Sequence, residues 1–475
     1  MFKQGFPSVH FYDQDFVDLY ERSWAWLDDF WVKGTKENGF AGRFFNYPEQ
    51  DYVSQFESCM ATFFLVFSNR NFPATPSLDN FYAKQEENGA IRGMYSVTTG
   101  KPVKTKDNPE VIEAPLFSFA EFNLFHKEGN KKRLRDVMPI LEKYYAWVEE
   151  TFRQDNGLYH APYSALKMPG APREEAYYPI DFNTQQAINA LYMSAIGDVL
   201  NDKELAFKYK RNYFSLKTRI NSLMWNEETG FYHDLDKDEK RLSPKTIAGF
   251  WPLLAELPNE EKANRLIDHL KNPETFGTDN PFPTLAADEP EFCEEGKGCR
   301  GAVVPVFNFI VIKGLEKYDR YDLARECAIR HIYYMLDALH PEDKKKKGNI
   351  YEAYKPMSEG PSTWQGKHDW PRPLFLTYAA LSSITVMIEN IVGLYISLPR
   401  KTVDWIIPTL EIMGIEDLSL KRNMITILSN KSGRGWEIRL ESEKLYYFTI
   451  HILGEKKKKT LPIPSGKCSM LIDKL

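Results

Sequence analysis

The sequence is poor in cysteine and in net charge, and each shortage excludes a class of protein. Its five cysteines are odd in number and none is spaced as C-x-x-C, which argues against a disulfide framework and against a structural zinc site. The net charge of -5 leaves no basic face that could neutralise many phosphates, so nucleic acid is not an expected partner. We expect neither a bound metal nor a cofactor.

The sequence also lacks a stretch with the length and apolarity of a membrane span. The longest apolar run, "LFLTYAALSSITVMI" at residues 374–388, contains Thr and Ser and is soon followed by Glu389, which indicates a buried helix. The first residues, "MFKQGFPSVHFYDQ", contain no apolar run of signal-peptide length. We therefore expect a cytoplasmic protein without a membrane partner.

What the sequence does contain is a long series of amphipathic segments. Up to residue 395, stretches such as "DFVDLYERSWAWLDDFW" and "NTQQAINALYMSAIGDVL" place apolar residues three and four apart, as on one face of a helix. Later stretches such as "NMITILSN" and "LYYFTIHIL" nearly alternate, which is typical of antiparallel strands. We predict a helical domain over residues 1–395 and a small β-sandwich-like accessory domain over residues 396–475.

Similar turn signals recur between the helical segments. They are "NGF" at Asn38, "NGAIRG" at Asn88, "NGLYHA" at Asn156, "TGFYHD" at Thr229 and "GNIYEA" at Gly348, and the region from "FGTDNPFP" to "GKGCRGA" supplies a sixth. Six helix pairs with equivalent loops at one end would close into an (α/α)6 toroid, with the loops forming a cup. The periodicity alone leaves a second interpretation open, in which Asn-Gly and Thr-Gly are ordinary helix terminators.

Several stretches resemble, in the same order, conserved blocks of the glycoside hydrolases of family sixty-three. The resemblance extends to the mannosylglycerate hydrolase-like group of the six-hairpin superfamily of trehalases and glucoamylase-like enzymes. The blocks lie within residues 50–390 and include "SLDNFYAKQEENGAIRG", "GFWPLLAEL", "FPTLAADEPEF", "CRGAVVPVFNFIVIKGLEKY" and "IYEAYKP". The resemblance implies an (α/α)6 barrel that hydrolyses the α-glycosidic bond of an α-glucoside or α-mannoside with inversion. A carbohydrate is therefore the expected partner.

The resemblance also implies a general base. Inverting hydrolysis uses a protonated acid at the leaving oxygen and a carboxylate across the ring that activates water. The family's base has a tyrosine-flanked context that "IYEAYKP" matches, which makes Glu352 the expected base and leaves Tyr351 and Tyr354 to orient it or to line the sugar pocket. For Glu352 taken alone, the alternative is a surface glutamate in a loop.

The general acid is less easily assigned. The family's acid is the aspartate of a "DNSPR"-like segment, and "LKMPGAPREE" places Pro169 at that position while retaining Arg173, which we expect to bind substrate. A proline cannot donate a proton, so the substitutes are Glu175, then Glu174, then Asp181. Asp181 is also an expected substrate-binding residue, although it fits better as a helix N-cap. If none of them serves, the alternative is a catalytically impaired carbohydrate-binding protein derived from this fold.

Three further segments match positions that surround the sugar in the family. The "WDT" segment, which holds the sugar, resembles "FESC", so Phe56 and Glu57 are expected to bind substrate, and Glu57 could supply the missing proton. The alternative for Glu57 is a helix N-terminus, where its charge favours the helix dipole. Arg300 in "CRGAVVP" is expected to face the substrate and would favour a carboxylate-bearing ligand. Trp370 in "HDWPRPLFL" is expected to stack on the ring or to pack in the core.

A lyase or epimerase remains as a third class of function. Such a toroid would need a basic His or Tyr in the cup, and His160 and His368 are the candidates. We rank this class last.

Overall fold

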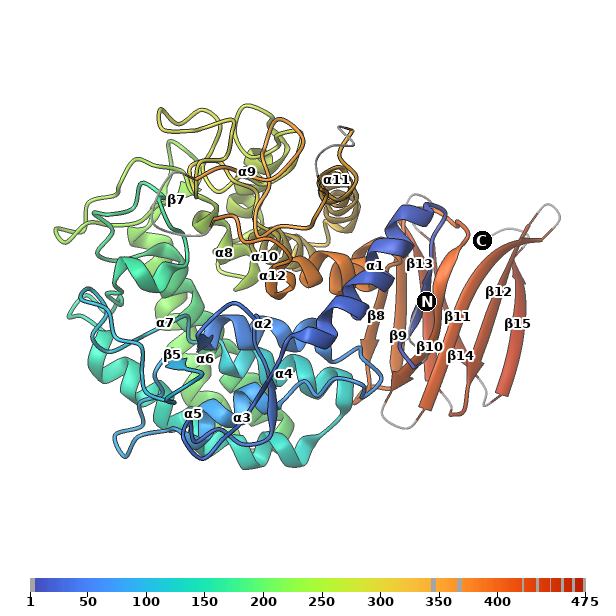
Figure 1. Cartoon of the computed structure of the whole chain (residues 1–475), viewed down its shortest axis with the longest axis horizontal. Helices are drawn as coiled ribbons and strands as arrows, with labels where there is room; N and C mark the ends of the chain where they lie inside the picture. The colour runs from blue at the N-terminus through green and yellow to red at the C-terminus, as the bar shows by residue number, and fades with distance from the viewer. Residues whose placement is uncertain are drawn as a thin grey trace.

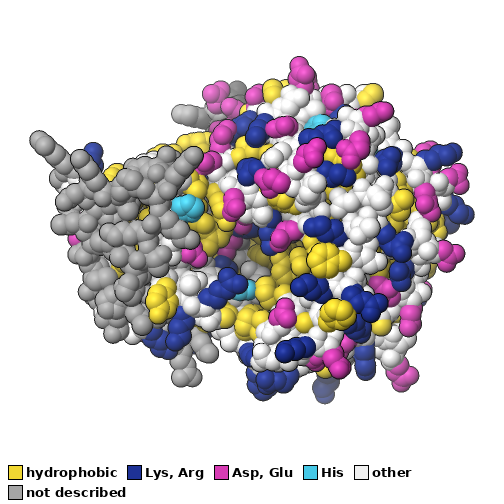
Figure 2. All heavy atoms as spheres, turned by 180° about the vertical axis from the view of Figure 1, so that it is seen from behind, with side chains coloured by type: hydrophobic (Ala, Val, Ile, Leu, Met, Phe, Trp, Pro, Cys, Tyr) yellow, Lys and Arg dark blue, Asp and Glu magenta, His cyan; other side chains and the backbone are white. Residues whose placement is uncertain are grey.

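The computed structural model describes residues 5–342, 347–364, 370–420, 423–432, 435–444, 446–453, 457–463 and 466–472. Figure 1 shows a body of helices with β-strands gathered at one end of the molecule. In this described part of the chain, no helix has the length and apolarity needed to cross a membrane. On the face seen in Figure 2, acidic and basic side chains are interspersed over the helical body.

Among the described residues, six helical segments form a closed inner ring. Each segment contacts the next: α2 with α4, α4 with α6, α6 with α8, α8 with α10, α10 with α12, and α12 with α2. The bounds of these segments are α2 (Gln55–Leu65), α4 (Phe117–Glu128), α6 (Ile180–Leu200), α8 (Trp251–Leu254), α10 (Pro305–Glu316) and α12 (Leu376–Ala380), the last continued by the π-helix η4 (Leu381–Ile391). Every residue of α2 and η4 is buried, which accounts for the apolar run predicted to be a buried helix.

Outer helices alternate with the inner ones along the chain. Within the described residues they are α1 (Gln14–Trp26), α3 (Pro76–Ala83), α5 (Lys131–Phe152), α7 (Lys203–Leu223), α9 (Glu260–Lys271) and α11 (Tyr321–Leu339). In α5, Leu134, Val137, Met138 and Leu141 are buried, because one stripe of the helix packs inward while the opposite face meets water. The alternation of inner and outer helices is the predicted (α/α)6 toroid.

The connections that lead from an outer helix to the next inner helix carry the recurrent turns. Hydrogen bonds join these loops across the ring: Cys299 N–H donates to the Pro169 carbonyl over 2.9 Å, and the Tyr47 hydroxyl donates to the Pro373 carbonyl over 2.9 Å. The loops contain the short strands β2 (Trp31–Lys33), β3 (Arg43–Phe45), β4 (Tyr52–Ser54), β5 (Met94–Ser96), β6 (Trp225–Asn226) and β7 (Phe231–Tyr232), and the 3-10 helices η1 (Leu27–Asp29), η2 (Tyr163–Leu166) and η3 (Ile247–Phe250).

Two sheets make up the β-rich end of the molecule. One has the order β1-β10-β11-β12-β15 and the other β14-β13-β9-β8. The bounds are β1 (Ser8–His10), β8 (Leu394–Ser397), β9 (Thr402–Ile407), β10 (Met413–Leu420), β11 (Asn423–Ser432), β12 (Gly435–Ser442), β13 (Tyr446–Ile452), β14 (Lys457–Ile463) and β15 (Gly466–Ile472). The first strand of the chain, β1, thus pairs with β10, which belongs to the C-terminal part of the chain.

The β region differs from the predicted antiparallel pattern at one pair of strands. Strands β9 and β13 run parallel, because the chain passes through β10, β11 and β12 of the other sheet before it returns to the side of β9. Alternating hydrophobicity reports only that one face of a strand is buried, so it could not distinguish the two orientations.

A buried ion-pair network joins η4 to the ring. Glu389 of η4 accepts from Lys127 over 2.5 Å and pairs with Lys313 of α10 over 2.7 Å. Lys313 also pairs with Glu316 over 2.7 Å, and Glu316 accepts from Tyr395 of β8 over 2.9 Å. Burial disfavours the charge of Glu389, but the two ammonium groups outweigh burial and lower the pKa of Glu389 to about 2.

Candidate active site

A cavity of about 720 Å³ opens among the loops. Its size is that of a small-molecule site. Its lining is acidic and aromatic: Glu49, Asp51, Glu57, Asp107 and Glu352 supply carboxylates, Lys167 and Arg372 supply cations, Tyr47, Tyr52, Tyr163, Trp370 and Tyr378 supply rings, and Gln50, Met94, Val103, Thr105, Ser164, Met168 and Pro169 complete it. Carboxylates between aromatic rings can accept hydrogen bonds from sugar hydroxyls while the rings cover the apolar faces of the sugar.

Glu352 is held in the cavity wall by Arg372. Both carboxylate oxygens of Glu352 accept from the guanidinium, at 2.8 Å and 2.7 Å, and the Glu352 N–H donates to the Arg372 carbonyl over 2.9 Å. Glu352 is only 4% exposed. Burial opposes the charge of Arg372, but its hydrogen bonds and ion pair with Glu352 outweigh burial and raise the pKa of Arg372. A carboxylate oxygen has two lone pairs, so Glu352 can still accept from a water molecule.

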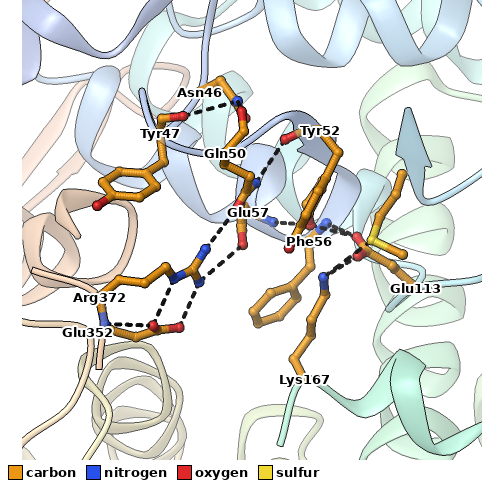
Figure 3. Close-up of polar contacts among 12 residues, drawn as sticks. Asn46, Tyr47, Gln50, Tyr52, Phe56, Glu57, Glu113, Lys167, Glu352 and Arg372 are labelled. Carbon is orange, nitrogen blue, oxygen red and sulfur yellow. Dashed lines mark hydrogen bonds and ion pairs between the residues drawn. The ribbon is translucent and has the colours of Figure 1, made fainter. Parts of the chain in front are cut away.

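Glu57 lies beside the same cation. It occupies the first turn of α2, where the helix begins with the Ser54 hydroxyl accepting from the Glu57 N–H. One Glu57 oxygen accepts from Gln50 over 2.8 Å, and the other lies 3.9 Å from the Arg372 nitrogen that binds Glu352. The side-chain amide oxygen of Gln50 accepts from Arg372 over 2.6 Å, which closes a network of four side chains (Figure 3).

The geometry of this network limits the distance between the two carboxylates. A single Arg372 nitrogen lies 2.7 Å from an oxygen of Glu352 and 3.9 Å from an oxygen of Glu57, so these oxygens are separated by no more than the sum of the two distances. That limit lies at the lower end of the roughly 6.5–9.5 Å found between the acid and the base of inverting glycosidases. The shared cation therefore brings an oxygen of Glu57 close to an oxygen of Glu352.

A second ion pair, between Glu113 and Lys167, forms another part of the wall. Glu113 is fully buried, and one of its oxygens accepts from the Ser54 hydroxyl over 2.7 Å and from the Phe56 N–H over 2.9 Å at the start of α2. Its other oxygen pairs with the Lys167 ammonium. Burial raises the pKa of Glu113, although Lys167 opposes this. Burial lowers the pKa of Lys167, but Glu113 outweighs it and the net pKa is raised.

Some of the residues that the sequence singled out meet in this cavity. Glu352, Glu57, Pro169 and Trp370 all line it. The Trp370 ring is half-buried, and its Nε1–H donates to Ser362 over 3.0 Å. Phe56 is buried beneath, with its ring centroid 6.3 Å from that of Tyr378.

The two tyrosines beside Glu352 face other surroundings. Tyr354 is fully buried, and its hydroxyl accepts from the Tyr351 N–H over 3.0 Å. Tyr351 lines a separate cavity together with Lys355 and Glu359. Neither tyrosine is part of the lining of the cavity that Glu352 faces.

Arg173 and Asp181 form a buried structural cluster outside the cavity. The Arg173 guanidinium donates to both oxygens of Asp181, at 2.8 Å and 2.7 Å, and to both oxygens of Asp234, at 2.7 Å and 2.8 Å. The suggested N-cap role of Asp181 is wrong, because α6 begins at Ile180 after the N-cap Pro179, and Asp181 lies inside the first turn.

Three other predicted residues also lie away from the cavity lining. Glu174 and Glu175 are exposed to solvent. Arg300 donates to the Gly170 carbonyl over 2.8 Å and pairs with Glu291 over 3.1 Å. Their expected contacts with substrate therefore have no support from this arrangement.

His160 and His368 are the two histidines that a lyase could use. His160 stacks on Tyr177 with centroids 4.0 Å apart, and its Nδ1 lies 2.8 Å from the Tyr177 carbonyl. His368 falls outside the described residues.

Sequence reasoning missed Gln50, Arg372, Glu113 and Lys167. Arg372 follows Trp370 by two residues, and Lys167 precedes Pro169 by two, so both lay inside segments already singled out. Glu113 and Gln50 carried no motif. A glutamate shortly before an apolar inner helix would have been the signal for Glu113.

Two family models match the chain. The mannosylglycerate hydrolase MGH1-like glycoside hydrolase domain matches residues 163–370, and the trehalase C-terminal domain matches residues 393–475. An uncharacterized protein of Borreliella burgdorferi (strain ATCC 35210 / DSM 4680 / CIP 102532 / B31) is 52% identical over 483 residues, which span 100% of both chains.

Solved structures of glycosidases share the fold. A GH63 mannosylglycerate hydrolase from Thermus thermophilus, in complex with glucose, is similar with a TM-score of 0.56 and 16% identity, covering 78% of this chain and 98% of that one. Neutral trehalase from Saccharomyces cerevisiae is similar with a TM-score of 0.51 and 13% identity, covering 72% of each chain. At these identities the likeness concerns the fold.

Proposed function

We propose that this chain, which contains a mannosylglycerate hydrolase MGH1-like glycoside hydrolase domain over residues 163–370 and a trehalase C-terminal domain over residues 393–475, hydrolyses an α-glycosidic bond with inversion. Glu352 is the general base in this proposal. The reaction places a sugar in the cavity and a water molecule between its anomeric carbon and the Glu352 carboxylate. The water attacks while Glu352 takes its proton.

The observation that carries the proposal is the placement of Glu352. It is a buried carboxylate on the wall of the cavity, and Arg372 holds both of its oxygens in one orientation. A base whose side chain is already oriented loses little entropy when the water binds. A bidentate ion pair also weakens a carboxylate as a base, so the water must share the oxygens with Arg372.

The remaining polar groups suit the binding of a neutral sugar. Glu57 and Gln50 face the cavity beside the base, where they can accept from or donate to hydroxyl groups. Trp370 and Tyr378 offer ring faces. We propose an α-glucoside or α-mannoside, and the position of Arg300 outside the lining removes the reason to favour a carboxylate-bearing glycoside.

The first prediction concerns Glu352. Glu352→Gln keeps the shape of the side chain but cannot accept the proton of water, so we expect turnover to fall by at least about 100-fold. Purified wild-type and variant proteins would be compared on α-glucosides, α-mannosides and glycerate glycosides, with sugar affinity measured by calorimetry. Retention of wild-type turnover by the variant would remove Glu352 from the mechanism.

A second candidate function is sugar binding without cleavage. Pro169 favours it, because this proline lines the cavity at the position of the family's acid and has no proton to give. A wild-type protein that binds a sugar in the calorimeter and cleaves none of the substrates would support this candidate against the hydrolase.

A further inference from the structure

Cleavage of an unactivated glycoside requires a proton at the leaving oxygen. We propose that the ammonium group of Lys167 donates this proton and so takes the place of the absent carboxylic acid. The inference rests on the proposed hydrolase function.

The position of Lys167 suits that role. Its side chain lines the cavity and is 16% exposed, so the ammonium group is largely shielded from bulk water. Figure 3 shows Glu352 and Arg372 on one side of Glu57, and Lys167 with Glu113 on the other. Lys167 comes from the segment that follows η2, two residues before Pro169, and its backbone has the left-handed φ of 56° that ends this short helix. A base and a donor on different walls are what inversion requires.

The other acidic groups of the cavity are less suitable. Asp107 accepts from the Ser164 N–H over 3.0 Å and the Thr105 hydroxyl over 2.8 Å; burial raises its pKa, but these hydrogen bonds outweigh burial and the pKa of Asp107 is lowered. Glu49 and Asp51 are exposed to solvent. Glu57 shares its cation with the base.

The groups that face Lys167 keep it protonated. Glu113 pairs with the ammonium from beneath, the Tyr52 ring centroid lies 5.9 Å from Nζ, and Met94 sulfur lies 4.0 Å away. Glu57 adds a further negative charge nearby. The donor is therefore charged before the substrate enters.

The proton balance of the step is complete. The oxygen of water forms a bond to the anomeric carbon, and its proton passes to Glu352. The bond from the anomeric carbon to the leaving oxygen breaks, its electron pair stays on that oxygen, and the oxygen takes a proton from Lys167 Nζ. Glu352 then releases its proton to solvent and the Lys167 amine takes one up.

The role predicts a particular pH profile. A carboxylic acid donor must stay protonated, so it gives a basic limb where it ionises. The pKa of Lys167 is raised above its ordinary value by Glu113, against the effect of burial. We therefore expect kcat/KM to show no basic limb from the donor up to at least about pH 9, since an ordinary lysine ionises near 10.4.

The decisive test compares substrates that differ in their need for a proton. Fluoride leaves without protonation, whereas an alkoxide does not. We expect Lys167→Gln to lose at least about 100-fold on an α-glucoside or α-mannoside and less than about threefold on the matching α-glycosyl fluoride. Lys167→Arg keeps the charge and can pair with Glu113, but its N–H groups are fixed in a planar fork instead of on a single rotatable ammonium, so it should show the same selective loss.

Two further variants separate proton donation by Lys167 from a loss of folding and from donation by Tyr52. Lys167→Gln leaves the Glu113 carboxylate buried without its cation, which could prevent the single variant from folding. The double variant Lys167→Gln with Glu113→Gln removes both charges, so the same comparison of substrates can be made with it. Tyr52→Phe tests the neighbouring hydroxyl as donor and should show no selective loss.

Several results would overturn the assignment. Full activity of Lys167→Arg on the glycoside would show that Lys167 acts through its positive charge and not as a proton donor. Equal losses of Lys167→Gln on the glycoside and the fluoride would show that Lys167 has a structural role. Selective loss in Tyr52→Phe with none in the Lys167 variants would move the role to Tyr52. A wild-type protein that cleaves neither glycoside nor fluoride would refute the hydrolase itself, whereas unchanged Lys167 variants of an active enzyme would refute this inference alone.

Discussion

Two arginine side chains of this protein, Arg372 and Arg173, each lie beside two carboxylates. Arg372 binds Glu352 and approaches Glu57, and Arg173 binds Asp181 and Asp234. The clusters differ in access: the first lines the cavity, while Arg173 is 1% exposed. Arg372 therefore orients the candidate base Glu352, whereas Arg173 connects its own loop to Asp181 of α6 and to Asp234.

The Arg173 cluster yields a stability prediction. Arg173→Met leaves Asp181 and Asp234 buried without a cation, so we expect the free energy of unfolding to fall by about 3–5 kcal/mol. Urea unfolding of the wild-type protein and the variant would measure this loss of stability. Lys132→Ala is the control, because its ion pair with Asp136 has side chains 80% and 55% exposed and should matter by at most about 1 kcal/mol. A stable Arg173→Met variant that had lost sugar binding would instead make Arg173 a substrate ligand.

At the scale of elements, η4 connects the helical ring to the strand that follows it. Its Glu389 bridges Lys127 of α4 and Lys313 of α10, and Asn390 donates to Glu316 over 2.6 Å. The π-helix is therefore anchored by charge as well as by its buried apolar residues. This anchor holds the end of the inner ring against β8.

The anchor predicts a pH dependence of stability. The pKa of Glu389 is about 2 in the folded chain against an ordinary 4.5, so its stabilisation is complete above about 4.5 and is lost as the pH falls toward 2. The difference in unfolding free energy between wild type and Glu389→Gln should shrink over that interval.

A surface carboxylate, Glu256, provides the control for Glu389. Glu256→Gln removes the 3.0 Å pair with Lys317 on the surface, where the Glu256 side chain is 49% exposed, and should change stability little. A difference between wild type and Glu389→Gln that stayed constant from pH 5 to about pH 2 would contradict the lowered pKa.

The elements show why part of the structure could be predicted. Helices such as α5 are specified by local apolar spacing, and the turns after Asn88 or Asn156 are specified by Asn-Gly, so these elements were predictable from the chain, whereas their closure into a toroid was implied by the order of the family-like blocks. The direction of β9 relative to β13 was not, because it depends on which sheet the intervening strands join.

Across the whole molecule, the site is assembled from loops distant in sequence. Glu352 and Glu57 could be singled out by motif, but the cation between them, Arg372, meets Gln50 from the first part of the chain. Lys167 meets Glu113 in the same way. Such pairings depend on how the loops pack around the ring, and a motif in one loop says nothing of its partner in another.

The stereochemistry of hydrolysis reports directly on whether Glu352 is the base of an inverting hydrolase. Wild-type protein would be mixed with α-glucosyl or α-mannosyl fluoride, and the first sugar released would be followed by proton NMR before it mutarotates. We expect the β-anomer to appear first and Glu352→Gln to form it at least about 100-fold more slowly. First appearance of the α-anomer, or equal rates from the two proteins, would contradict the assignment of Glu352 as the base of an inverting hydrolase.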